Sequence, residues 1–151
     1  MKAKKNVYDI RISLEVLSTK LASTNMSEKI ISILDNLLSE VKGKLRKESP
    51  NYFVPKDLEF HRYISKGSGN MRLMLILDNL CEQILHIRCW LIETGLKRSA
   101  EKETLERHMK VLMYLKEKDT KKAMEMMEEH LERGKERALR RLENKNIELK
   151  Q

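Results

Sequence analysis

The chain has 151 residues, 40% of them hydrophobic and 36% charged, with a formal net charge of +8. This length is that of one domain, and the apolar share is large enough for a core, which excludes wholesale disorder. No apolar run approaches the ~18 residues of a membrane span, and no apolar segment follows the basic N-terminus, so neither a membrane protein nor a secreted one is expected.

The composition predicts an all-α protein. Only 5 Gly and 2 Pro occur, among abundant Leu, Met, Glu, Lys and Arg, whereas sandwiches and barrels need many turns. The positive charge is mixed with glutamate along the helices, so it indicates solvated faces rather than a nucleic-acid groove. The two cysteines are too few for a disulfide framework and fit a reducing cytoplasm.

Apolar residues at spacings of three and four predict the first three helices. The first runs from about Val7 to Ala22, and the second follows Ser27 and ends near Gly43. Residues 46–55 contain both prolines and are interpreted as a connector. A third, shorter helix is expected over residues 56–66, with Gly67 as its C-terminal cap.

Three more helices complete the chain. Ser68-Gly69-Asn70 opens the fourth, which ends near Gly95 and is apolar nearly all round, so it is predicted to be the central buried helix. The fifth spans residues 101–116, and Asp119 is the expected N-cap of the sixth. With short joints and no internal repeat, residues 1–151 are predicted to form one antiparallel six-helix bundle.

Three of the four histidines lie on predicted inner faces. Asp57 and His61 are four residues apart, so both project from one face of the third helix and can chelate one divalent ion. His108 shares a face with leucines, and His130 with Ala123 and methionine. No phosphate-binding loop, nucleophile elbow or Cys-x-x-Cys pair accompanies them.

His108 and His130 are expected to lie at similar distances from the turn between the last two helices. If the helices turn around Lys118, His108 lies ten residues before the turn and His130 twelve after it, so the arms measure about 15 and 18 Å. With Asp57 and His61 they offer three nitrogens and one oxygen, a set that suits zinc, nickel, iron or manganese and leaves positions for a small ligand. From spacing alone, histidines that only pack in the core remain the alternative.

Several short motifs then point to a family. The chain resembles the FCD domain, the ligand-binding C-terminal domain of GntR-type bacterial transcription regulators, over about residues 6 to 143. The motifs that carry this resemblance are Arg11-Ile12-Ser13-Leu14-Glu15, Asp57-Leu58-Glu59-Phe60-His61, Ser68-Gly69-Asn70, and His108 followed by Asp119, Ala123 and His130-Leu131.

The resemblance implies a divalent metal, zinc foremost, held by Asp57, His61, His108 and His130, as in a metal-binding six-helix subgroup. It also implies a central cavity for a ligand or metal, in which a small organic acid binds beside the metal and alters how a homodimeric repressor holds its operator. Arg11 is the candidate partner of a ligand carboxylate. Asn70 is a second candidate ligand contact, with capping of the fourth helix as its other role.

The resemblance implies a separate reader of DNA. Family members carry a winged helix-turn-helix before this domain, whereas Met1 here stands almost where the sensor begins. The chain is therefore expected to be the sensor half of a longer regulator or a stand-alone sensor, with DNA contacts only through a missing N-terminal domain.

The sequence thus predicts a cytoplasmic, metal-dependent sensor of a small carboxylate, and not an enzyme. A helical metalloenzyme using the same three-histidine, one-aspartate site is the alternative, with Glu59 or Glu106 as its base. A helical interaction module without metal is the third possibility.

Overall fold

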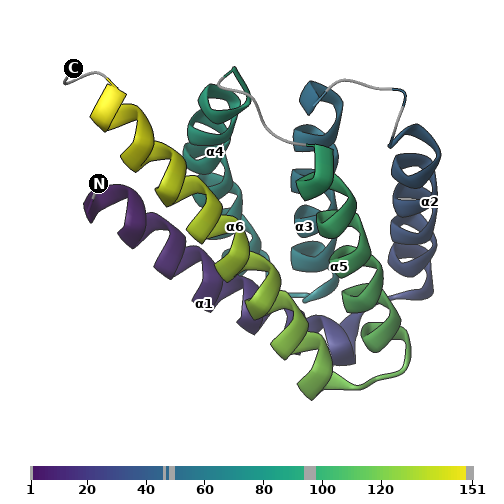
Figure 1. The fold of residues 1–151 in the computed structure, drawn as a ribbon. Helices are drawn as coiled ribbons and strands as arrows, with labels where there is room; N and C mark the ends of the chain where they lie inside the picture. Colours follow the sequence, from purple (N-terminus) through teal and green to yellow (C-terminus); the bar gives the residue numbers. More distant parts are fainter. Residues whose placement is uncertain (1, 46, 48–49, 94–97, 149–151) are drawn as a thin grey trace.

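The computed structural model describes residues 2–45, 47, 50–93 and 98–148, and within these ranges every regular element is an α-helix (Figure 1). This confirms the predicted all-α bundle of six helices. In chain order the helices are α1 (Lys2–Asn25), α2 (Glu28–Lys44), α3 (Pro50–Gly67), α4 (Met71–Glu93), α5 (Arg98–Lys116) and α6 (Thr120–Glu148). The predicted end of the fourth helix near Gly95 lies outside the described residues.

Side-chain caps begin three of the helices where the sequence places them. Ser27 Oγ, Asn70 Oδ1 and Asp119 Oδ1 each accept a hydrogen bond from the backbone amide three residues later, at 3.4, 3.1 and 3.1 Å. Such caps satisfy amides that the first turn of a helix leaves without an acceptor. The caps at Asn70 and Asp119 combine with the left-handed residues Gly69 (φ 72°) and Lys118 (φ 58°) to fix the α3–α4 and α5–α6 turns.

The third helix begins six residues earlier than predicted. Residues 50–55 are helical, so the interpretation of 46–55 as a connector is wrong for this part. Pro50 stands at the first helical position, where a missing amide costs nothing. Pro55 lies inside the helix, and the burial of Phe53 and Val54 beside it offsets the loss of one backbone hydrogen bond. The left-handed residue after the helix is Gly69 rather than the predicted cap Gly67.

The fourth helix is not the central one. Although Leu73, Leu77 and Ile84 of α4 are buried, Met71 and Leu75 are 64% and 58% exposed. Instead α1, α3 and α5 each pack against four other helices. The sequence hides the position of α1 because its buried face is largely polar, whereas some of the apolar residues whose spacing predicts this helix are exposed.

The helices that hold the histidines are neighbours of α1 or of one another. Helices α1 and α6 run antiparallel and side by side, and α5 forms a hairpin with α6 (Figure 1). Helix α3 packs on α1 and α5, with α2 outside it. No helix over the described residues has the length and apolar character to cross a membrane.

Candidate metal centre

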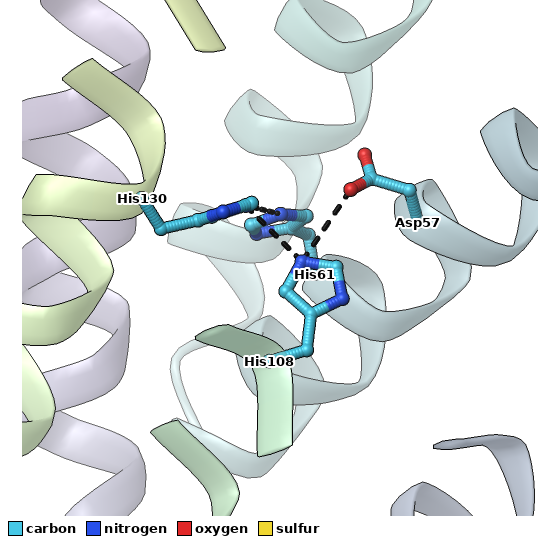
Figure 2. Close-up of side chains that lie close together, drawn as sticks. All are labelled: Asp57, His61, His108 and His130. Atoms are coloured by element: carbon cyan, nitrogen blue, oxygen red, sulfur yellow. Dashed lines mark hydrogen bonds and ion pairs between the residues drawn. The ribbon is translucent and has the colours of Figure 1, made fainter. Parts of the chain in front are cut away.

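Four side chains from three helices converge inside the bundle. Asp57 and His61 come from α3, His108 from α5 and His130 from α6, and we call these four residues the quartet (Figure 2). One possible ligand atom from each lies within 4.8 Å of all the others. The structure therefore brings together all four residues that the sequence predicts as ligands.

The spacing of the ligand atoms suits a single small cation. The Nε2 atom of His130 lies 3.2 Å from His61 Nε2 and 3.1 Å from His108 Nε2. Asp57 Oδ1 lies 3.4 Å from His108 Nε2. Bonds of about 2.0–2.1 Å in tetrahedral geometry hold neighbouring ligand atoms about 3.3 Å apart. These three separations are therefore ones that a zinc-sized ion bridges.

Burial keeps His130 in the form that a metal needs. All four residues of the quartet are buried. The pKa of His130 lies well below its usual value, first because burial disfavours the charged ring and next because His108 and His61 are close. A neutral imidazole offers a lone pair, so His130 is a competent ligand at neutral pH.

The chemistry of the donor set also fits a cation. His61 Nδ1 faces Glu15 Oε2 at 3.1 Å. An ionised carboxylate only accepts hydrogen bonds, so Nδ1 carries the proton and Nε2 presents a lone pair to the quartet. A cation among the three converging Nε2 atoms satisfies all of them at once, whereas a single shared proton does not.

A buried ion pair supports the quartet from α1. Arg11 Nε donates to Glu15 Oε1 at 3.1 Å, and both side chains are at most 5% exposed. Burial acts to raise the pKa of Glu15, but the nearby His61 and Arg11 outweigh it and the net shift is downward. Glu15 is not among the site residues that the sequence predicts. Its position four residues after Arg11, on the same helix face, was the available signal.

A cavity of about 120 Å³ lies beside the quartet. Arg11, Asp57, His108 and His130 line it together with an apolar wall. That wall includes Leu38, Val41, Phe53, Val54 and Leu105. The Nη2 atom of Arg11 is buried and has no hydrogen-bond partner among the described residues. An unpaired buried donor is costly, so this atom lacks an acceptor that the surrounding described residues do not supply.

The sequence matches one protein-family model over most of its length. The model of the FCD domain matches residues 6–133. The chain belongs to the FCD domain family. Among proteins of curated function, no match to the sequence was found.

Two solved structures share the fold of this FCD domain. E. coli McbR/YncC is 19% identical over 91% of this chain and 64% of its own, with a TM-score of 0.83. Streptococcus agalactiae GntR is 21% identical over 89% of this chain and 59% of its own, with a TM-score of 0.73. This FCD domain therefore spans less than two thirds of the length of each, and these neighbours are regulators of the GntR family.

The remaining sequence-predicted residues lie apart from the quartet. Asn70 of this FCD domain is exposed at the start of α4, where it caps the helix, and it is not among the residues that line the cavity. Glu59 pairs with Lys56 at 3.3 Å, and Glu106 lies 3.9 Å from Lys102. Neither glutamate belongs to the quartet or to the lining of the cavity.

Proposed function

We propose that this FCD domain is the metal-dependent sensor of a small carboxylate and that it controls DNA binding by a separate domain of a transcription regulator. Its family supports the coarse part of this proposal, since an FCD domain of GntR-family regulators senses ligands. The observation that carries the finer part is that Arg11, whose buried Nη2 atom is unpaired, lines the same cavity as Asp57, His108 and His130.

Asp57, His61, His108 and His130 are the residues that would hold the metal. Three imidazoles and one carboxylate suit zinc foremost, and they also accept nickel, iron or manganese. When bound, the ion would supply positive charge and open coordination positions to an anionic ligand. The buried ring of His130, neutral because of its surroundings, and the orientation of His61 by Glu15 both favour this ligand set.

Arg11 is the proposed partner of the effector's carboxylate. Its guanidinium uses Nε for Glu15, which leaves Nη2 for an oxygen of the effector. A buried apolar cavity of about 150 Å³ is large enough to accept a benzene molecule. The cavity beside the quartet is slightly smaller than that. Its wall combines aliphatic side chains and Phe53 with charged side chains, among them Lys56, Glu101, Arg137 and Arg141. An acid with a short apolar body of a few carbons fits both the size and the wall.

Effector binding would be read out by the helices that line the cavity. The lining residues belong to α1, α2, α3, α5 and α6, so an acid bound between these helices can shift their relative positions. In our proposal this shift is transmitted through a homodimer to a DNA-binding domain outside this chain, in the cytoplasm. The effector thereby alters the affinity for DNA.

The proposal is tested by metal analysis and by calorimetry. Protein purified without added metal should carry a near-stoichiometric divalent ion, and it should bind one of a series of acids from acetate to hexanoate and succinate. His108→Ala should lose the ion, whereas His86→Ala, on the exposed face of α4, should keep it. Arg11→Met should keep the ion and lose the acid.

Two results would contradict the proposal. One is a metal content below about a tenth of stoichiometry that His108→Ala leaves unchanged, in which case the histidines only pack. The other is turnover of a substrate by the metal-loaded protein that chelation abolishes, which would favour the metalloenzyme.

A further inference from the structure

We propose that Glu15 is a shared positioning residue that makes metal binding and carboxylate recognition depend on one side chain. This inference rests on the proposed function and adds a residue that touches neither metal nor effector. The two oxygens of Glu15 have different partners, since Oε2 faces His61 and Oε1 faces Arg11.

The contact with His61 sets the ring for metal binding. His61 Nδ1 lies 3.1 Å from Glu15 Oε2, and His61 Nε2 lies 3.2 Å from His130 Nε2. A carboxylate on one ring nitrogen fixes the tautomer, holds the ring plane and raises the basicity of the other nitrogen. The metal affinity of the quartet therefore depends on a side chain from α1, a helix that contributes none of its ligands.

The contact with Arg11 sets the guanidinium for the effector. The guanidinium is planar, so a bond from Nε to Glu15 Oε1 at 3.1 Å also fixes the direction of Nη2. Without that bond the long side chain is free to adopt other rotamers, which binding an acid would then have to restrict. Glu15 therefore prepares Arg11 before the acid arrives.

Both contacts are protected from water, which makes the arrangement effective. Glu15 and His61 are 1% and 2% exposed, and Arg11 is 4% exposed. Charged hydrogen bonds in such surroundings are stronger than at the surface, and each partner depends on the others for its charge balance. Loss of Glu15 should consequently weaken both metal binding, through His61, and carboxylate binding, through Arg11.

The test uses Co²⁺ as the metal probe and butyrate as the carboxylate probe. In Glu15→Gln we expect the Co²⁺ affinity to fall by about 10- to 100-fold, with a changed visible spectrum of the bound ion. At saturating Co²⁺, the affinity for butyrate should fall as well, because Gln lacks the negative charge that holds Arg11 and its single oxygen can accept from only one of the two partners of Glu15. Ser18→Ala is the matched control: Ser18 is buried on the same helix and its Oγ has no hydrogen-bond partner among the described residues, so both affinities should stay unchanged.

A second pair of variants covers the case in which Glu15→Gln does not fold because it leaves the charge of Arg11 buried. Arg11→Met is compared with Arg11→Met/Glu15→Gln, in which that charge is absent. The double variant should bind Co²⁺ about 10- to 100-fold more weakly than Arg11→Met, through the contact with His61 alone.

The outcomes separate this inference from the proposed function. Wild-type protein that binds no Co²⁺ contradicts the proposed function and the inference with it. Wild-type affinities and an unchanged Co²⁺ spectrum in folded Glu15→Gln overturn the role of Glu15 alone. A loss of Co²⁺ affinity with an intact butyrate affinity at saturating Co²⁺ overturns the shared role.

Discussion

The Nε2 atoms of His61 and His130 lie 3.2 Å apart, although 69 residues separate the two histidines in the sequence. Their helices, α3 and α6, do not pack directly on each other over the described residues. The two rings therefore link two helices whose backbones do not pack on each other. A metal ion in the quartet would cross-link three helices.

Removal of the metal should therefore destabilise the protein. A ligand that binds only the folded state at a hundred times its Kd adds about 2.7 kcal/mol to the free energy of unfolding. For a domain of this size, each kcal/mol corresponds to about 2–4 °C in Tm. We expect EDTA to lower Tm by about 5–10 °C in a thermal scan. His108→Ala, measured alongside, should show a low Tm that EDTA does not change; an unchanged Tm of the wild type would contradict a metal site.

The metal-free protein should lose stability as the pH falls below about 6.5. His130 has a folded-state pKa well below that of the unfolded chain, so between these two values only the unfolded chain takes up the proton. The free energy of unfolding should then decrease by up to about 1.4 kcal/mol per pH unit from this group.

Urea unfolding at pH 7.5, 6.5 and 5.5 measures this effect. His130→Gln should give a flatter profile than the wild type over this range. The pKa of Glu15 is shifted downward from an ordinary value near 4.5, so its own contribution is lost only at lower pH. Parallel profiles for the two proteins would show that His130 is not held neutral.

Phe60→Leu should weaken both the core and the metal site. Phe60 is fully buried, and its ring stacks on His108 with centroids 3.9 Å apart and an interplanar angle of 11°. The smaller side chain should cost about 1–2 kcal/mol, less than the 3–5 kcal/mol typical of truncation to Ala. It should also lower Zn²⁺ affinity by up to about ten-fold, because the His108 ring loses the surface that orients it.

Ile64→Val provides the comparison for Phe60→Leu. Ile64 is equally buried one turn later on α3, so this variant should lose about 0.5–1.5 kcal/mol. Its Zn²⁺ affinity, measured by competition with a chelating dye, should not change. Equal Zn²⁺ affinities in the two variants would remove the orienting role of Phe60.

Asn70→Ala separates the two roles that the sequence suggests for this residue. As the cap of α4, its loss should cost about 1 kcal/mol in urea unfolding, with no change in the affinity for butyrate. Ser27→Ala removes the corresponding cap of α2 and should behave in the same way. A fall in butyrate affinity in Asn70→Ala alone would restore the role of Asn70 as a ligand contact.

The sequence predicts the helices well because their signals are local. Ser27 and Asp119 stand at caps, and these need only a side-chain oxygen three residues before an amide. The start of α3 is missed because two prolines are typical of a connector, and only the packing of Phe53 and Val54 makes a helix there favourable.

The sequence by itself determined the all-α fold and the identity of the quartet. The i, i+4 spacing of Asp57 and His61 and the matched heights of His108 and His130 on a hairpin are properties of helical geometry, which a sequence expresses directly. Tertiary structure alone decided that α1 lies at the centre, that α4 carries exposed apolar residues, and that Glu15 joins Arg11 to His61. Those features depend on contacts between distant segments, and a buried polar face looks like a surface until the helices that cover it are in place.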